Sequence, residues 1–275
     1  MAKSIFLFIS GTAGAGKNTM ISKLQEKNNE VHFLRSHTSR PRRNDDKSDT
    51  YHYVDSHEEF EKLIDNGDIL EFDKFNGNYY GISKNEIERL KTMDKIVMKD
   101  LSVLGVSNLR GLKLDFVSIF LTAPKSILKD RLIKRNYDKK QIKSRLNLYN
   151  AEQMKMSTYD YVIENIEIDL TAEKLFAIAN MERNNLPLLT LESCQNVLNK
   201  TLDKLTRKIE KGKFVGYVKV VAKNNRVYIV EGINEYLAYL KTNTHCPKLF
   251  VNSTNLTENE ENLKEWEKLV ELYKN

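Results

Sequence analysis

The sequence predicts an α/β fold built around a parallel β-sheet, followed by a smaller α+β unit. Three observations lead to this prediction. An apolar run at residues 4–9 is followed by a glycine-rich turn and a segment with helical spacing, which is how an α/β fold begins. Strand-like and helix-like segments then alternate as far as residue 181. Near residues 183–187 the composition changes, and a hairpin and several short helices follow.

The composition is that of a soluble chain with a substantial core. Of 275 residues, 40% are hydrophobic and 30% are charged, which excludes wholesale disorder, and no apolar run is long enough to span a membrane. Two cysteines, Cys194 and Cys246, are too few for a disulfide framework, so we expect a cytoplasmic protein. The net charge of +6 predicts either a solvated lysine-rich surface or one that attracts nucleotide phosphates or nucleic acid.

The first part of the chain supplies strands and helices in alternation. Ser56 is a predicted helix cap with Glu59 three positions later, and Ser83 and Thr122 are further caps. Residues 40–48 are polar and basic and are expected to form a loop. The expected strands are 4–9, 31–35, 69–75, 95–101, 114–121 and 161–164, and the expected helices are 17–27, 57–65, 84–93, 124–134, 138–154 and 170–181.

The last part of the chain is predicted to be a domain of its own, with domains at 1–185 and 186–275. Asn224-Asn225 is a good hairpin turn between strands 214–222 and 226–230. Helices are expected at 198–211, 233–240 and 258–273, and a strand at 248–251. Residues 226–240 are faintly similar to ParB-like and sulfiredoxin-like domains, but Glu231 and Glu235 depart from that pattern and argue against a nucleotide site. The role of this part is not predicted.

The glycine-rich turn after the first strand has the spacing of a phosphate-binding loop. Residues 11–17 match GxxxxGK between a strand and a helix, where backbone N–H groups and the helix N-terminus attract phosphate oxygens. Lys17 would stabilise charge on the transferring phosphate. The next residue is Asn18 and not a hydroxyl residue, and it offers only an amide oxygen to a magnesium ion. The predicted ATP-binding residues are Gly11, Thr12, Ala13, Gly14, Ala15, Gly16, Lys17, Asn18 and Thr19.

A second group of residues has the chemistry to hold a nucleoside monophosphate. Arg40, Arg42 and Arg43 follow Ser36 and offer paired donors to a phosphate, or they form a solvated basic loop. Hydroxyl groups would complete the phosphate shell. A carboxylate such as Glu71 can accept hydrogen bonds from guanine N1–H and the 2-amino group, which adenine lacks, although a strand-end surface charge is the alternative.

Together with Tyr51 and the pair Tyr79-Tyr80, these motifs resemble the guanylate kinase family over residues 4–182. The resemblance implies a P-loop NTPase-type sheet core with nucleoside-monophosphate-binding and lid subdomains. It also implies that ATP phosphorylates GMP or dGMP with Mg²⁺, as part of purine nucleotide metabolism. It assigns Ser36, Arg40, one of Arg42 and Arg43, Tyr51 and Tyr80 to the monophosphate and Glu71 to guanine.

The chain departs from the family pattern at three places. Pro41 comes one position early, which leaves the choice between Arg42 and Arg43 open. Ile82 stands where the family has Ser or Thr, with Ser83 next. Of two acids expected one residue apart at the end of the strand at 95–101, only Asp100 is present, and Ser102 replaces the other. Ser83 and Asp100 are therefore added to the predicted GMP-binding residues, and Asn18 and Asp100 are the predicted magnesium ligands.

Basic residues between 128 and 146 resemble the lid of the family, which brings arginines to the transferring phosphoryl group. We predict catalytic roles for Arg131, Arg135 and Arg145. Solvated helices are the alternative, and Tyr137 and Tyr149 are too few aromatic residues to favour nucleic-acid binding. Two other functions stay open, namely a kinase for another nucleoside monophosphate and a catalytically weak binding module. The sequence predicts no membrane partner and leaves the oligomeric state open.

Overall fold

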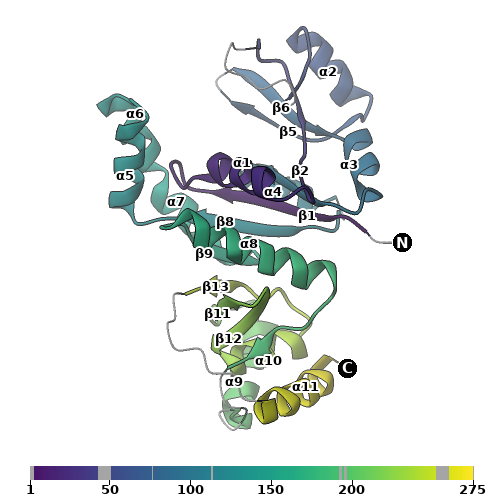
Figure 1. Ribbon diagram of the computed structural model, residues 1–275, viewed down its shortest axis with the longest axis vertical. Coiled ribbons are helices and arrows are strands. Elements are labelled where there is room, and N and C mark those ends of the chain that lie inside the picture. The colour runs from purple at the N-terminus through teal and green to yellow at the C-terminus, as the bar shows by residue number, and fades with distance from the viewer. Residues whose placement is uncertain are drawn as a thin grey trace. The chain divides into compact units, whose positions relative to one another are not determined.

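A computed structural model describes residues 3–42, 51–75, 77–112, 114–191, 194, 197–251 and 260–274 (Figure 1). The chain divides into two compact units. The first comprises residues 1–11 and 17–118, and the second comprises residues 12–16 and 119–275. Among the described residues, no helix is both long and apolar enough to cross a membrane.

The core of the first unit is a parallel sheet in the order β1-β7-β2, formed by β1 (Ile5–Gly11), β7 (Ile96–Asp100) and β2 (Val31–Phe33). Leu7, Phe8 and Ile9 are fully buried, as a continuous apolar run predicts for a central parallel strand. Helix α1 (Lys17–Lys27) packs on all three strands. Its buried residues are the ones at the predicted helical spacing, Met20, Ile21 and Leu24.

A second sheet of the first unit has the order β4-β3-β6-β5, formed by β4 (Tyr51–Tyr53), β3 (Ser36–Thr38), β6 (Asn78–Ser83) and β5 (Ile69–Phe75). Helices α2 (His57–Asp65) and α3 (Lys84–Lys91) accompany it, and the Ser56 hydroxyl caps α2 by accepting from Glu59 N, as predicted. Helix α4 (Val103–Arg110), which the sequence analysis did not predict, packs against both β1 and β5. It therefore links the two sheets of this unit.

The second unit contains strands in the order β10-β12-β11-β13-β9-β8. Their bounds are β10 (Leu189–Thr190), β12 (Arg226–Glu231), β11 (Val218–Lys223), β13 (Lys248–Phe250), β9 (Tyr161–Glu164) and β8 (Val117–Thr122). The first two residues of β8 belong to the first unit. Its α-helices are α5 (Lys125–Lys134), α6 (Lys139–Asn147), α7 (Tyr149–Gln153), α8 (Ile168–Arg183), α9 (Asn199–Glu210), α10 (Ile233–Lys241) and α11 (Glu260–Lys274). The helix predicted at 138–154 is thus two helices. Asn224 and Asn225 both have positive φ, as the predicted hairpin turn requires.

The predicted boundary at 185/186 falls inside the second unit. Strand β13 pairs in parallel with β9, with Lys248 opposite Tyr161 and Leu249 opposite Val162. Helix α8 packs on β11 and β12 (Figure 1), and the Trp266 indole N–H donates to Leu188 O at 2.8 Å. Val218 and Val220 of β11 and Val227 and Ile229 of β12 are buried, and α8 packs against these two strands. The physical reason is that β9 offers an edge and α8 an apolar face that the last part of the chain covers.

Candidate active site

The loop between β1 and α1 has a conformation that only glycine adopts readily. Gly14 and Gly16 have φ of +86° and +91°. A Cβ atom on Gly16 would lie 2.8 Å from Asn165 Nδ2, and one on Gly14 would lie 3.3 Å from Leu128 O. Both residues of the predicted phosphate loop are therefore glycine for reasons of backbone conformation and of space.

Asn165 holds this loop within the second unit, and the sequence analysis missed it. Its Nδ2 donates to Ala15 O at 2.7 Å, while its Oδ1 accepts from the Thr171 hydroxyl at 2.9 Å. The Thr12 N–H donates to Leu121 O at 3.2 Å. Asn165 directly follows buried strand β9, and a polar residue at the carboxyl end of a parallel strand is the signal that points to it.

Lys17 is the first residue of α1, and its ammonium donates to Gly11 O at 2.8 Å. Asn18 and Thr19 follow it and are exposed. The first turn of α1 contains no acidic residue, so its N–H groups and positive end are not neutralised by a carboxylate of that turn. This arrangement favours a polyphosphate at the start of the helix.

The predicted lid arginines lie on two helices of the second unit. Arg131 donates through Nη2 to Asn165 O at 2.9 Å and to Ile166 O at 3.1 Å. Its Nη1 is buried and has no hydrogen-bond acceptor within the described part of the chain. Burial and the charge of Arg135 lower the pKa of Arg131. Arg135 is exposed at the end of α5, and the Arg145 guanidinium lies 4.4 Å from the centre of the Tyr137 ring.

The predicted monophosphate ligands of the first unit gather around Tyr51. Buried Ser36 is opposite Tyr51 in the β3–β4 pair, and Tyr80 packs edge-on against the Tyr51 ring with centroids 5.9 Å apart. The Arg40 guanidinium lies 5.4 Å from the same ring centre, and Arg42 lies 5.2 Å from the ring centre of Tyr53. Arg43 is outside the described residues. The arrangement brings three hydroxyls, those of Ser36, Tyr51 and Tyr80, and the Arg40 guanidinium to one face of the short sheet.

The two adjacent tyrosines of β6 have different environments. Tyr79 is buried and stacks on Phe60 with centroids 5.0 Å apart, and its hydroxyl donates to Glu61 Oε1 at 2.6 Å. Tyr80 points to the other side of the strand, where Tyr51 lies. Tyr79 therefore packs in the core of this unit, and Tyr80 is available to a ligand.

Glu71 is a buried carboxylate, with 4% of its surface exposed. Its Oε1 has no hydrogen-bond donor within the described residues, whereas the Asn108 side chain donates to the carboxylate. A Cβ atom on Gly105 would lie 2.9 Å from Oε1, so glycine makes room for this acid. Burial, with a contribution from Asp73, raises the pKa of Glu71 to about 7, while Asn108 and Lys99 act in the opposite direction. An unpartnered buried acceptor is costly unless a ligand supplies its donors.

The residues at the positions that depart from the family pattern have structural tasks. The Ser83 hydroxyl accepts from Glu86 N and caps α3, and the Ser102 hydroxyl accepts from Gly105 N and caps α4. Ile82 is fully buried. Asp100 ends β7 with its side chain 26% exposed, and its Oδ1 lies 3.5 Å from Lys99 Nζ. Within the described residues, no group of three or more acidic, histidine or cysteine side chains forms a metal site.

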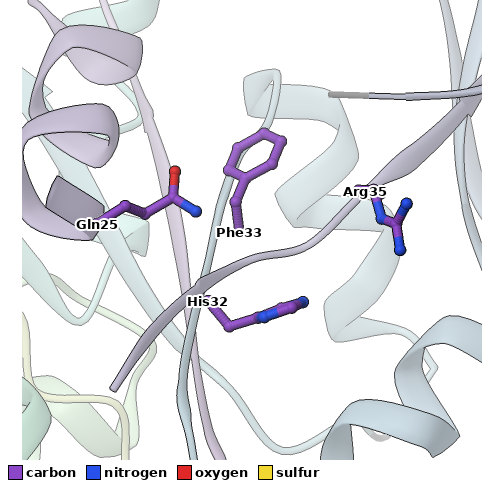
Figure 2. A pocket seen from close by; sticks show the side chains of 4 residues that line it. All are labelled: Gln25, His32, Phe33 and Arg35. Atoms are coloured by element: carbon purple, nitrogen blue, oxygen red, sulfur yellow. The ribbon is translucent and has the colours of Figure 1, made fainter. Parts of the chain in front are cut away.

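A hollow of about 290 Å³ lies beside β2. It is lined by Gln25 of α1, by His32 and Phe33 of β2, and by Arg35 (Figure 2). None of these residues was predicted as a site residue. The centre of the Phe33 ring lies 4.4 Å from Lys99 Nζ.

Comparisons with known proteins agree with this geometry. The family model described as guanylate kinase matches residues 3–182. The guanylate kinase of Campylobacter jejuni is 38% identical over 197 residues, which cover 70% of this chain and 96% of that protein. The guanylate kinase of Helicobacter pylori is 34% identical over 199 residues, which cover 71% of this chain and 97% of that protein. The crystal structure of guanylate kinase from Anaplasma phagocytophilum is 26% identical, with a TM-score of 0.53, and covers 66% of this chain and 88% of that chain. The similarity of residues 226–240 to ParB-like domains is not shown by these matches.

Proposed function

Because the chain belongs to the guanylate kinase family and is thus a nucleoside monophosphate kinase that binds ATP and phosphorylates GMP, we propose how its own residues carry out the transfer. The observation that carries this proposal is Glu71, a buried carboxylate with one oxygen lacking a donor in the described structure. Guanine supplies two adjacent donors, N1–H and the 2-amino group, and adenine supplies neither. Guanine can therefore compensate for the burial of Glu71, and adenine leaves it unpaired.

The donor phosphates bind to the loop at residues 11–17. Its N–H groups and the start of α1 hold the phosphate oxygens, with Asn18 and Thr19 beside them. Lys17 moves its ammonium from Gly11 O to the transferring phosphoryl group and offsets the charge that develops there. Asn165 keeps the loop in shape from the end of β9.

The acceptor phosphate binds among Ser36, Arg40, Tyr51 and Tyr80, with Arg42 at the rim near Tyr53. Arg43 remains a proposed ligand from the sequence. Hydroxyls and guanidinium groups donate to the phosphate dianion and hold one oxygen ready to attack. Ser83 caps α3, so we propose that it supports the base pocket through that helix.

Charge on the phosphoryl group during transfer is neutralised by Arg131, Arg135 and Arg145. Arg131 Nη1, which has no acceptor in the described residues, is the donor best suited to this task. The donor chemistry also fits a magnesium ion that arrives with ATP, since Asn18 has an amide oxygen on an exposed helical turn and Asp100 a partly exposed carboxylate. Asn18 and Asp100 would hold such an ion, which would supply positive charge to offset the charge of the phosphates.

We also propose that every residue of the reaction lies within residues 1–185, so that residues 186–275 support the fold and not the chemistry. We propose a reducing, cytoplasmic setting, because a chain of this length has only two cysteines, Cys194 and Cys246.

An assay of ADP release with ATP and a panel of GMP, dGMP, AMP, UMP and CMP tests the proposal. The expected result is a kcat/KM for GMP at least about tenfold above that for AMP, because loss of buried hydrogen bonds costs about 1–3 kcal/mol. A preference for another monophosphate would replace the guanine assignment of Glu71. Binding of GMP without turnover would make the protein a binding module.

A further inference from the structure

Lys99 is a buried lysine that the predicted reaction does not use. It lies in β7 beside Asp100, and only 4% of its surface is exposed. Buried lysines are rare and need a partner for their charge. Lys99 has a loose one, since its Nζ lies 3.5 Å from Asp100 Oδ1, beyond the distance of about 2.7–2.9 Å of a good charge-assisted hydrogen bond.

The surroundings of Lys99 belong to the proposed acceptor site. Its ammonium lies 5.4 Å from the centre of the Tyr51 ring and 4.4 Å from that of Phe33. The Arg40 guanidinium lies 5.4 Å from the centre of the same Tyr51 ring. Two cations thus contact one ring whose hydroxyl is a proposed phosphate ligand, and such contacts fix the orientation of the ring.

Lys99 also interacts with the acid that is proposed to read the base. Burial lowers the pKa of Lys99, while the carboxylates of Asp100 and Glu71 favour its charged form. In return, the Lys99 charge acts to lower the pKa of Glu71, with Asn108, against burial and Asp73. Asp73 on β5, Lys99 on β7 and Asn108 on α4 are the charged and polar groups that act on Glu71.

We propose that Lys99 is a positioning residue of the acceptor site, whose buried ammonium offsets the carboxylates of Glu71 and Asp100 and orients the Tyr51 ring for guanine and a phosphate dianion. The inference rests on the proposed function and adds to it a residue that was not among the predicted ligands. It also explains why a lysine is tolerated in a strand that is otherwise buried from Ile96 to Met98.

The test compares Lys99→Met, which removes the charge at similar length, with Lys99→Arg, which keeps it. Lys84→Met removes an exposed lysine from α3 and serves as the matched control. In the full-length protein, GMP binding is measured by calorimetry without ATP from pH 5.5 to 8.5, and kcat and KM are measured for GMP and ATP.

For Lys99→Met we expect GMP to bind about tenfold more weakly near pH 7, with KM for ATP within about twofold of the unaltered protein. The pH of half-maximal GMP binding should move upward, because Glu71 then loses the neighbouring charge that keeps it ionised. The shift should be absent from Lys99→Arg and Lys84→Met. It should also disappear when Glu71→Gln is combined with Lys99→Met, which a merely structural role of Lys99 does not predict.

The proposal would be overturned if Lys99→Met weakened GMP and ATP binding equally and left the pH of half-maximal GMP binding unchanged. Unchanged GMP binding in Lys99→Met would also overturn it. If Lys99→Met does not fold, Lys99→Arg provides the test. An upward shift of the pH of half-maximal GMP binding in Lys99→Arg would overturn the proposal, because this variant retains the charge. GMP binding without turnover in the unaltered protein would contradict the proposed function and leave the Lys99 inference standing.

Discussion

The side chain of Asn165 and the backbone of Ala15 are joined by a hydrogen bond of 2.7 Å, and the next residue, Gly16, has no room for a Cβ atom because of the same Nδ2 atom. The shape of the phosphate loop therefore depends on a residue 150 positions away along the chain. Arg131 donates to the main-chain oxygen of Asn165, so one residue supports both the loop and a lid arginine.

Asn165→Ala is expected to weaken ATP binding more than GMP binding. The substitution leaves Ala15 O and the Thr171 hydroxyl without this buried partner, at a cost of about 1–3 kcal/mol. We expect KM for ATP to rise about tenfold while KM for GMP changes less than about threefold, as steady-state kinetics would measure. Asn184→Ala, which removes an exposed amide near the end of α8, is the control. Equal effects on the two substrates would contradict the assignment.

Gly16→Ala is expected to abolish most activity, because it adds a clash to an unfavourable φ. Gly212→Ala separates the two causes, since Gly212 has φ of +69° and nothing within 4 Å of the methyl group that alanine would add. Both variants should lose about 1 kcal/mol of unfolding free energy from backbone strain. Only Gly16→Ala should lose nucleotide binding. Similar activity in both variants would show that the space beside Asn165 is unimportant.

Lys17→Met should reduce kcat by orders of magnitude and leave the melting temperature nearly unchanged. A lysine on the transferring phosphate acts mainly in the transition state, and in the free protein its hydrogen bond to Gly11 O is only partly buried. The measurement is single-turnover transfer from ATP to GMP, with thermal unfolding in parallel. A variant that keeps most of the rate would place the reaction elsewhere.

GMP binding should depend on the ionisation of Glu71. Its pKa is raised to about 7, so its proton must leave before both oxygens can accept from guanine. Below pH 7 the KM for GMP should rise by up to about tenfold per pH unit, and above pH 7 it should level off. Glu71→Gln should weaken GMP binding and retain only the ionisation of the GMP phosphate, with a pKa of about 6.

Ionisation of Glu71 should favour GMP binding but lower the free energy of unfolding of the nucleotide-free protein. The folded protein holds the Glu71 proton up to about pH 7 and the unfolded chain releases it near its ordinary pKa. The stability of the nucleotide-free protein should therefore fall as pH rises between these values. Glu71→Gln should raise the melting temperature at pH 8 more than at pH 5. The reverse order would contradict the burial of an acid that has one oxygen without a donor among the described residues.

Tyr79→Phe and Tyr80→Phe form a matched pair on neighbouring residues of β6. Tyr79→Phe removes a hydrogen bond to Glu61 and should cost about 1 kcal/mol of stability with little effect on GMP. Tyr80→Phe should raise KM for GMP and leave the melting temperature unchanged, because its hydroxyl is proposed to bind the phosphate. A raised KM for GMP in Tyr79→Phe with a loss of stability in Tyr80→Phe would contradict the side-chain directions assigned to the two tyrosines.

A fragment of residues 1–185 should keep catalysis per folded molecule but lose stability and solubility. It retains every proposed site residue and exposes the edge of β9 and the face of α8 that packs on β11 and β12. Urea unfolding and active-site titration of the fragment would measure both effects. Limited proteolysis of the intact chain near residues 183–185 tests the boundary directly. A stable, fully soluble fragment would contradict this prediction and show that a separate domain begins at residue 186.

The sequence was most informative where local patterns determine structure. The apolar run of β1, the buried face of α1 and the cap at Ser56 were all predictable from adjacent residues. Helix α4 was missed although Ser102 caps it, because it is short and contains Gly105, whose role becomes visible only beside Glu71. Strands β3 and β4 are polar and three residues long, so their pairing and not their composition defines them.

Long-range relations were beyond the sequence. The contacts of Asn165 with Ala15 and of Lys99 with Tyr51 join residues that no common motif connects. The pairing of β13 with β9 is of the same kind, and for that reason a change in composition near residue 185 did not indicate the end of a compact unit.

The pairing of β13 with β9 has a consequence for the making of the protein. A ribosome adds about 5–20 residues per second, so β9 is finished several seconds before its neighbour at Lys248–Phe250 exists. During that interval β9 pairs with β8 on one side, and its other edge is open. The second unit can therefore complete its folding only after Lys248–Phe250 has been made, and translation speed over residues 186–250 controls how long that edge is open to incorrect partners.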